Sequence, residues 1–308
     1  MLQIEGFDGQ ILENESLSSH CTWKIGGIAK YIVSPQDEKD LKIILGWAKR
    51  NGIPWYIVGN GSNILFPDDG IDGIVIKMNR GFKNKCLINY DGSEVITYFG
   101  AGNLASEVVS YLLKMELEGL EFISGIPGCV GGLLKMNAGA FGNEIGNFVE
   151  WINVYNPYSG AITLQKKNLK FSYRRLELSE DFIILGGAFR VKMGNKNSIK
   201  EKIKDYQKIR MEKQPLGEAS CGSVFKNPKE GPAGKIIEEV GLKGFQVGGA
   251  RISDVHANFI INTGNATAKD ILTLIELIKQ KVWLKKGITL EEEVVKIGIK
   301  KTIKARVI

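Results

Sequence analysis

The 308-residue sequence predicts an α+β protein made of two or three parts, and three observations support this. Strand and helix periodicities alternate through the first third of the chain. The stretch around residues 150–190 alternates with period two, which is typical of an antiparallel sheet. After residue 214 the pattern changes again and ends in one long amphipathic helix. We place boundaries near residues 80, 205 and 290.

The first part is expected to form strand, helix and strand. Residues 30–34 and 53–58 have strand character, and Gly52 ends the helix between them. The apolar face of this helix consists of Leu41, Ile44, Leu45 and Ala48. Residues 59–65 (Gly-Asn-Gly-Ser-Asn-Ile-Leu) precede Pro67, so they are expected to form a loop and a second strand rather than a helix.

The middle part combines another helix with the predicted antiparallel sheet. Residues 95–100 are an expected strand, Asn103 an expected N-cap, and Gly119 an expected helix end. Residues 151–155 and 182–191 are expected sheet strands. The apolar stripe of the helix consists of Leu104, Val108, Val109, Leu112 and Leu113.

The last part contains the clearest helix of the sequence. Thr267 and Asp270 form a capping-box pattern, and Gly287 is the expected end. Its buried face is predicted to be Ile271, Leu274, Ile275, Ile278 and Val282. Residues 198–211 are an expected charged helix, Pro232 starts a shorter one, and residues 291–299 are an expected strand.

Composition excludes several classes of site. The excess of Lys and Arg, 41 against 34 acidic residues, gives a net charge of +7, which suits an anionic small ligand but also an ordinary solvated surface. No apolar run reaches the roughly 20 residues of a membrane helix, and the acidic start does not resemble a signal peptide, so we expect a cytoplasmic protein. We expect neither a metal site nor a disulfide, because the cysteines and histidines that could form one are scattered along the chain. They are Cys21, Cys86, Cys129, Cys221, His20 and His256.

The glycine-rich loops predict a phosphate-containing ligand. Backbone N–H groups can converge on phosphate oxygens where glycine removes the Cβ, and residues 59–63 fit this need. A Rossmann turn would have a third glycine where this chain has Ile64, so a standard dinucleotide fold is disfavoured. A tight structural turn is the alternative for one loop alone. Residues 100–102, 125–132 and 137–142 are three more glycine-rich segments. Together the four segments suggest backbone wrapped around a long ligand.

These segments resemble those of the UDP-N-acetylenolpyruvoylglucosamine reductases, the MurB family. The likeness runs from about Thr22 to Gly298, and order and spacing agree. No tyrosine-bearing insertion follows Tyr173-Arg174, so the chain resembles the shorter, second type. The motifs are residues 22–27 (Thr-Trp-Lys-Ile-Gly-Gly), 59–65, Ile126-Pro127-Gly128 with Val130-Gly131-Gly132, Asn137-Ala138-Gly139-Ala140, Tyr173-Arg174, residues 222–228 (Gly-Ser-Val-Phe-Lys-Asn-Pro) and Glu293-Val294.

The resemblance implies a two-part FAD-binding module of the vanillyl-alcohol-oxidase (PCMH) type and a C-terminal α+β substrate domain. Residues 1–80 with 291–308 would form one FAD-binding subdomain, residues 81–205 the second, and residues 206–290 the substrate domain. The implied reaction is NADPH-dependent reduction of the enolpyruvyl ether of a UDP-sugar through noncovalent FAD, in peptidoglycan precursor synthesis. We expect a monomer without nucleic-acid or membrane partners.

The resemblance also assigns residues to the cofactor. The FAD pyrophosphate and neighbouring groups would be held by Gly59, Asn60, Gly61, Ser62, Asn63, Gly102, Gly125, Ile126, Pro127, Gly128, Cys129, Gly131 and Gly132. Three residues, Asn137, Ala138 and Gly139, would lie near the flavin.

Three residues are expected to carry the reaction. Reducing an enol ether places negative charge on the carbon that bears the carboxylate, so a cation, a proton donor and the flavin must meet there. Arg174 suits the cation role and Tyr173 would support it. By resemblance Ser223 donates the proton, and Glu293 acts on the carboxylate or enol. The alternatives are a solvated basic turn, a turn serine and a solvated charge run.

Strand alternation separates Glu293 from its acidic neighbours. Glu292 is expected to point to the opposite face, and Val294 fixes the register of the motif. Five weaker candidates for UDP-sugar contacts are expected in the substrate domain, namely Lys213, Asn227, Lys235, Gln246 and His256. For His256 a buried structural histidine is an equal alternative.

Some positions depart from the family pattern. Leu176 stands where the family usually has serine, and Val295 where it usually has arginine. Lys296 is expected on the other side of its strand and so is no obvious substitute, while Cys129 replaces the usual hydroxyl residue of the pyrophosphate loop. Two rival functions therefore stay open: an FAD-dependent oxidase of the same fold, and an inactive flavin- or nucleotide-binding paralogue.

Overall fold

The computed structural model describes residues 2–92 and 94–299, and the chain divides into two compact units. Unit 1 comprises Met1–Glu13, Tyr31–Ser62 and Gly73–Leu216. Unit 2 comprises Asn14–Lys30, Asn63–Asp72 and Gly217–Ile308. In this division residues 206–216 belong to unit 1 and three separate segments form unit 2, while the three-part scheme expected from the sequence stays a prediction. Both units mix helices and strands, so the predicted α+β class is confirmed.

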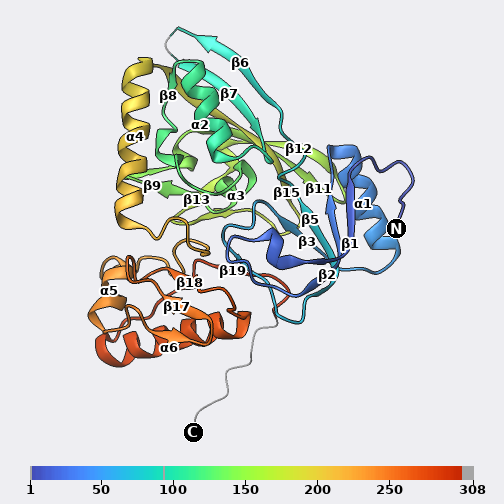
Figure 1. The fold of residues 1–308 in the computed structure, drawn as a ribbon. Helices are drawn as coiled ribbons and strands as arrows, with labels where there is room; N and C mark the ends of the chain where they lie inside the picture. Colours follow the sequence, from blue (N-terminus) through green and yellow to red (C-terminus); the bar gives the residue numbers. More distant parts are fainter. Residues whose placement is uncertain (1, 93, 300–308) are drawn as a thin grey trace. The chain divides into compact units, whose positions relative to one another are not determined.

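A four-stranded sheet in the order β1-β2-β5-β3 is accompanied by the first helix, α1 (Figure 1). The elements are β1 (Gln10–Ser16), β2 (Ile28–Ser34), α1 (Glu38–Arg50), β3 (Trp55–Val58) and β5 (Ile71–Lys77). Strand β3 runs parallel to β5. The Asp37 carboxylate caps α1 by accepting from the Asp40 N–H at 3.0 Å. The four predicted apolar positions of α1 are buried, as expected.

The larger sheet of unit 1 has the order β12-β11-β15-β7-β6, and β8 pairs with β15. The predicted strands are confirmed, and β11 and β15 are antiparallel. The sheet strands are β6 (Lys85–Asp91), β7 (Glu94–Gly100), β8 (Leu117–Glu118), β11 (Val149–Asn156), β12 (Gly160–Gln165) and β15 (Ile183–Met193).

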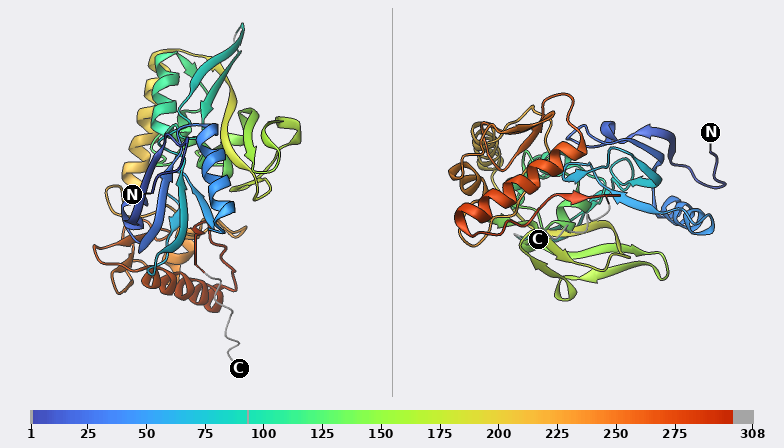
Figure 2. Two further views of the ribbon diagram at one scale, coloured as in Figure 1. Left: turned by 90° about the vertical axis from the view of Figure 1, so that its right-hand side faces the viewer. Right: turned by 90° about the horizontal axis from the view of Figure 1, so that it is seen from below.

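Three helices complete the core of this sheet: α2 (Ala105–Lys114), α3 (Val130–Lys135) and α4 (Lys196–Lys213). Helices α2 and α4 pack against each other, as Figure 1 and the left-hand view of Figure 2 show. Val108, Leu134 and Ile199 join one buried cluster with Phe189 of β15. Burying such side chains contributes about 1.5–3 kcal/mol each, which fixes the helices on the sheet.

The start of α2 differs from the expectation. The helix begins at Ala105 with Leu104 as N-cap, so Asn103 is not the cap. The Glu107 carboxylate accepts from the Leu104 N–H at 2.7 Å, and the Asn103 side chain instead donates to the carbonyls of Asn84 and Gly100. A side chain that bonds two carbonyls elsewhere in the fold is not available to cap the helix, and sequence alone does not show that these carbonyls lie within its reach.

The short elements of unit 1 form turns between these larger ones. Strands β13 and β14 make a hairpin, and β9 and β10 a second one. The short elements are η2 (Glu121–Ile123), β9 (Gly139–Ala140), β10 (Asn143–Glu144), η3 (Ile145–Asn147), η4 (Lys166–Asn168), β13 (Lys170–Ser172) and β14 (Arg175–Glu177).

Unit 2 joins a three-stranded sheet to the predicted long helix. Its elements are η1 (Leu17–His20), β4 (Ile64–Leu65), α5 (Ala233–Glu239), β16 (Gln246–Val247), β17 (Ala250–Ile252), β18 (Ile260–Asn262), α6 (Ala268–Lys286) and β19 (Val295–Lys296). Trp23 is fully buried and its Nε1 donates to the Ile260 carbonyl at 2.7 Å. The Thr22-Trp23 motif therefore anchors an N-terminal segment on the C-terminal sheet.

Helix α6 confirms its prediction, whereas the last strand is shorter than expected. Thr267 and Asp270 form the capping box, and Gly287 ends the helix with a left-handed φ of 68°. Of the expected strand 291–299 only Val295–Lys296 forms β19, which pairs in parallel with β4. Within the described ranges, no helix is both long and apolar enough to cross a bilayer.

Candidate functional site

Two of the predicted glycine loops lie together in unit 1. The Asn60 side-chain Nδ2 donates to the Pro127 carbonyl at 2.6 Å, and Asn79 donates to Asn60 Oδ1 at 3.1 Å. A Cβ at Gly59 would lie 2.5 Å from Cys129 Sγ, so only glycine fits between the loops. The structure thus brings residues 59–62 and 125–132 together, as the sequence predicted.

The backbone of these two loops offers converging donors. Burial raises the pKa of the Cys129 thiol, and the backbone N–H groups of Gly132, Asn60 and Gly131 oppose this rise through their interaction with its sulfur. N–H groups from separate segments that turn toward one place are what a diphosphate requires. The residues present therefore fit the FAD pyrophosphate, and with it the dinucleotide.

Gly102 has a structural reason for being glycine. A Cβ there would overlap the backbone carbonyl oxygens of Gly81 and Met78. Its contact with FAD stays a prediction.

The segment expected near the flavin is held by its own asparagine. Asn137 is 1% exposed, and its Nδ2 donates to the Glu144 carboxylate at 2.7 Å and to the Ser172 carbonyl at 2.9 Å. Its Oδ1 accepts from the Gly146 N–H. The Asn137 side chain is thus used within the protein, and it fixes residues 137–146 beside the β13–β14 hairpin.

Arg174 occupies the two-residue turn of that hairpin. Its backbone is left-handed, with φ 57°, and its Nη1 donates to the Gly139 carbonyl at 3.0 Å. The guanidinium lies 5.2 Å from the centre of the Tyr173 ring, a cation–π contact. Arg174 is therefore bonded to the segment 137–139, whereas Tyr173 is 45% exposed.

One basic residue near Arg174 was missed by sequence reasoning. Arg210 of α4 is 8% exposed, and burial and the charge of Arg174 both lower its pKa. Its guanidinium lies 5.4 Å from the Phe141 ring, which stacks on Tyr206 with 4.2 Å between ring centres. Tyr206 and Arg210 are four apart on one helix, so their shared face was the available signal.

Ser223 and Glu293 lie in unit 2 on neighbouring backbone segments. The Glu293 N–H donates to the Val224 carbonyl at 2.8 Å, and Phe225 and Glu292 form an antiparallel bridge. The Asn63 side chain donates to the Glu293 carbonyl at 3.0 Å, and the Asn63 carbonyl accepts from Val295. The structure therefore brings the end of the 59–63 loop, Glu293 and the segment that follows Ser223 together.

The acidic residues beside Glu293 have other partners. Glu292 pairs with Lys279 of α6 at 3.0 Å and with Lys296 at 2.6 Å, and these cations lower its pKa despite burial. Lys296 therefore lies on the side of Glu292, as expected. Leu176, which stands where the family usually has serine, is 1% exposed in the core of unit 1. This burial accounts for an apolar residue at that position.

The five candidates for substrate contacts are divided between the units. Lys213 ends α4 in unit 1, whereas the other four lie in unit 2. Asn227 accepts from the Ala233 N–H at 2.9 Å, beside Lys235, which pairs with Glu239 at 4.0 Å. Gln246 donates to the Gly248 carbonyl. None of these contacts tests a substrate role.

His256 has the features of a structural histidine. Its Nδ1 accepts from the Asn258 N–H at 3.1 Å, and its ring covers Gly234 of α5. Burial lowers its pKa, so the neutral ring is favoured. The described residues contain no group of three or more His, Cys, Asp or Glu arranged for a metal ion.

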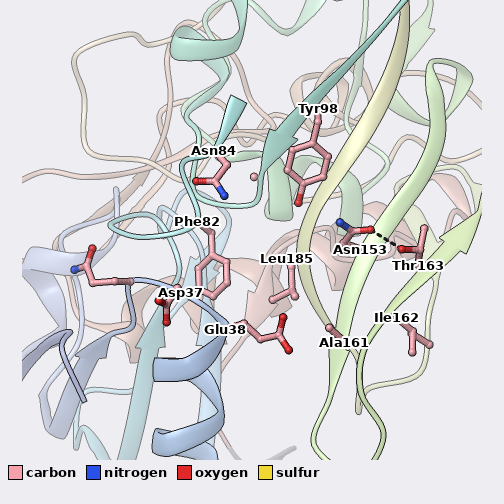
Figure 3. A pocket seen from close by; sticks show the side chains of 12 residues that line it. Asp37, Glu38, Phe82, Asn84, Tyr98, Asn153, Ala161, Ile162, Thr163 and Leu185 are labelled. Atoms are coloured by element: carbon pink, nitrogen blue, oxygen red, sulfur yellow. Dashed lines mark hydrogen bonds between the residues drawn. The ribbon is translucent and has the colours of Figure 1, made fainter. Parts of the chain in front are cut away.

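A cavity of about 430 Å³ in unit 1 lies outside the predicted site (Figure 3). One of the residues that line it, Gly100, belongs to the glycine-rich segment 100–102 that was expected to surround the ligand, and none of them was assigned by itself to the cofactor or the substrate. Thr163 donates to Asn153 at 3.0 Å, and burial raises the pKa of the neighbouring Tyr98. Asp37 and Glu38, at the start of α1, also line it.

Two family models match the chain. One, described as an FAD binding domain, covers residues 29–163, and the other, the C-terminal domain of UDP-N-acetylenolpyruvoylglucosamine reductase, covers residues 214–297. The glycine loops around Asn60 and Cys129 fall in the first match. Ser223 and Glu293 fall in the second.

Proteins named UDP-N-acetylenolpyruvoylglucosamine reductase are similar to this chain over most of its length. The relative from Caldanaerobacter subterraneus is 40% identical over 95% of each chain, and that from Clostridioides difficile is 40% identical over 92% of each. The crystal structure of the reductase (MurB) from Thermus caldophilus matches 94% of this chain and 99% of its own, with 32% identity and a TM-score of 0.77. On these matches the chain belongs to the UDP-N-acetylenolpyruvoylglucosamine reductase (MurB) family and is an FAD-dependent oxidoreductase.

Proposed function

We propose that this enzyme uses NADPH and FAD to reduce UDP-N-acetylglucosamine enolpyruvate to UDP-N-acetylmuramate, in peptidoglycan precursor synthesis in the cytoplasm. The main support is that Arg174, Ser223 and Glu293 all stand in the family's motifs, in a chain whose two glycine loops fit a dinucleotide. The likeness to named reductases over more than nine-tenths of the chain supports the same reaction.

FAD, when bound, supplies the hydride that it takes from NADPH. The protein must then stabilise the negative charge that develops on the substrate beside its carboxylate. Arg174 is suited to bind this carboxylate, because a guanidinium grips both oxygens and stays charged. Its bond to the Gly139 carbonyl and its contact with Tyr173 hold the guanidinium in one orientation before substrate arrives.

Ser223 is proposed to donate the proton that completes the reduction. A hydroxyl is a weak acid in water, but transfer to a strongly basic carbanion runs downhill. Gly222 is left-handed, with φ 78°, so the backbone turns directly before this serine. Glu293, held through its backbone by Val224 and Asn63, is proposed to act on the carboxylate or enol.

Stopped-flow absorbance tests the reaction against an oxidase of the same fold. We expect NADPH to bleach the bound flavin rapidly, air to restore its colour slowly, and enolpyruvyl UDP-N-acetylglucosamine to restore it rapidly. The product should be heavier by two hydrogens. Rapid reoxidation by air with no effect of the sugar would identify an oxidase, and a flavin that NADPH does not reduce would identify an inactive paralogue.

A further inference from the structure

Glu144 is an acidic residue of unit 1 to which neither the sequence nor the proposed mechanism gives a role. It lies on strand β10, directly opposite Gly139 of β9. Its Oε2 accepts a hydrogen bond from Asn137 Nδ2 at 2.7 Å, and Asn137 is 1% exposed. Asn137 is fixed in turn, because it also bonds the Ser172 carbonyl and the Gly146 N–H. One oxygen of the Glu144 carboxylate is therefore held at a defined place.

Glu144 and the guanidinium of Arg174 lie on the same side of Gly139. A Cβ at Gly139 would lie 3.0 Å from Glu144 Cγ and 3.1 Å from Arg174 Nη1. Both distances start at one point, so these two atoms cannot be farther apart than the sum of the distances. The carboxylate is bonded to Cγ, which places the guanidinium within its reach. Glycine permits this arrangement, because a side chain at residue 139 would occupy the same space.

We propose that Glu144 is a positioning residue: its carboxylate, held by Asn137, orients the guanidinium of Arg174 toward the substrate carboxylate. This rests on the proposed role of Arg174. The N–H donors of a guanidinium lie in one plane, and Nη1 already donates to the Gly139 carbonyl at 3.0 Å. A second acceptor fixes the rotation of this plane and leaves the other donors aimed in one direction. Glu144 itself contacts no reacting atom.

The charge of Glu144 and its orienting effect have opposite consequences for the substrate. A carboxylate beside Arg174 reduces the attraction of the guanidinium for a second carboxylate, so removing the charge should not weaken substrate binding. Losing the orientation should slow the step in which negative charge develops, because misplaced groups stabilise the transition state less. An unchanged or tighter Kd with a slower reaction is therefore the signature of positioning.

Glu144→Gln tests the proposal, because its amide oxygen can still accept from Asn137 while the charge is lost. Titration of the oxidised holoenzyme with enolpyruvyl UDP-N-acetylglucosamine, followed by flavin absorbance, should give a Kd between the wild-type value and about fivefold below it. In stopped flow, this sugar should reoxidise the reduced flavin roughly 10- to 100-fold more slowly, the range for a hydrogen bond to a charged group. Flavin reduction by NADPH should be unchanged, since it does not involve the substrate carboxylate.

Two further variants control for charge and for folding. Glu144→Asp keeps the charge but is one methylene shorter, so it cannot contact Asn137 and Arg174 together, and reoxidation by the sugar should again be slower. Glu177 of the neighbouring hairpin pairs with Lys170 at 3.0 Å, and Glu177→Gln should leave both half-reactions unchanged. If Glu144→Gln failed to fold, Glu144→Asp would decide the question, and wild-type reoxidation in it would overturn the proposal.

A double variant tests whether Glu144 acts through Arg174. In an Arg174→Lys background the planar guanidinium is absent, so Glu144→Gln should slow reoxidation by the sugar much less than it does in the wild type. This non-additive result is expected for residues that work as one unit. If the two losses were additive, Glu144 would act independently of Arg174, and the proposal would be wrong.

Other outcomes are equally decisive. Wild-type reoxidation by the sugar in Glu144→Gln overturns the proposal. Weaker FAD binding with slower reduction by NADPH also overturns it, since that pattern belongs to a residue that only supports the segment 137–146. A wild-type holoenzyme that the sugar does not reoxidise contradicts the proposed function itself, whereas normal wild-type turnover with unaffected Glu144 variants contradicts only this inference.

Discussion

Three non-glycine residues with left-handed backbone gather around one part of unit 1. The φ angles of Asn137, Phe141 and Arg174 are 42°, 52° and 57°. Each such conformation costs on the order of 1–3 kcal/mol and persists only where the surroundings impose it. Here the surroundings are the Asn137 bond to Ser172 and the Arg174 bond to Gly139. Backbone strain thus coincides with the segment predicted to lie near the flavin.

The role of Ser223 predicts a separation of the two half-reactions. In Ser223→Ala, flavin reduction by NADPH should be unchanged, because no proton goes to the substrate in that step. Turnover of the enolpyruvyl sugar should fall by roughly 10²–10⁴, the usual contribution of a general acid. Stopped-flow measurement of each step checks this, with Ser220→Ala as a nearby control. Equal slowing of both steps would contradict the proton-donor role.

The buried thiol of Cys221 predicts a loss of stability in alkali. Burial is the main cause that raises its pKa well above the ordinary value, and the charge of Glu293 adds to it. The unfolded chain releases this proton near pH 8.5 while the folded chain still holds it, so folded-state stability is lost as pH rises above that value. Urea unfolding between about pH 8 and about pH 10 should show this decline.

Two cysteine variants isolate the effect. Cys221→Ala should have a smaller pH dependence than the wild type, whereas Cys86→Ala, which changes an exposed thiol, should retain it. The same slope in all three proteins would show that other groups cause the decline.

At the scale of elements, the two glycine loops work as one unit. The loop after β3 and the loop before α3 are tied by Asn60 and Pro127 and touch at Gly59 and Cys129. Neither loop resembles a Rossmann turn, and α3 has only six residues, so its dipole is a minor contribution. The donors that we propose for a phosphate come instead from two segments that are far apart in sequence.

The contact between the loops predicts a rescue. Gly59→Ala places a Cβ 2.5 Å from Cys129 Sγ and should weaken FAD binding severely by forcing the loops apart. In the double variant Gly59→Ala with Cys129→Ala the clash is absent, so most of the affinity should return. Flavin fluorescence titration measures both. Non-additive recovery is the expected signature of direct contact, and additive losses would contradict it.

The same scale shows where local rules and tertiary structure differ. Helix α6 followed its sequence signals at both ends, because the cap, the apolar face and the terminal glycine are all local. The cap of α2 did not follow its sequence signal, because the Asn103 side chain donates to the Asn84 carbonyl on another segment. The last strand shortened to Val295–Lys296, since its partner β4 offers only two residues.

At the scale of the molecule, the chain alternates between the two units, and each unit is built from three separate segments. Residues 14–30 and 63–72 belong to unit 2, although residues on either side of them belong to unit 1. The N-terminal Trp23 is bonded to β18, and Asp68 accepts from the first N–H groups of α6 at 2.7 and 3.0 Å. Such long-range connections make unit 2 dependent on segments that precede most of unit 1.

FAD binding should therefore stabilise the protein measurably. At a free FAD concentration one hundred times Kd, linkage adds about 2.7 kcal/mol to the free energy of unfolding. Purified protein should be yellow, acid should release the pigment, and the apoprotein should melt at a lower temperature until FAD is restored. Calorimetry with and without FAD checks this. A colourless protein whose melting temperature ignores added FAD would contradict the flavin site.

The sequence alone determined the α+β class, most helix and strand positions, and the family, because periodicity, caps and motif order are local and linear properties. The pairing of Asn60 with Pro127, the backbone contact of Glu293 with Val224 and the burial of Arg210 were decided only by tertiary structure. The physical reason is that these contacts join residues 67, 69 and 88 positions apart or depend on exclusion from water, and neither property is written in a local pattern.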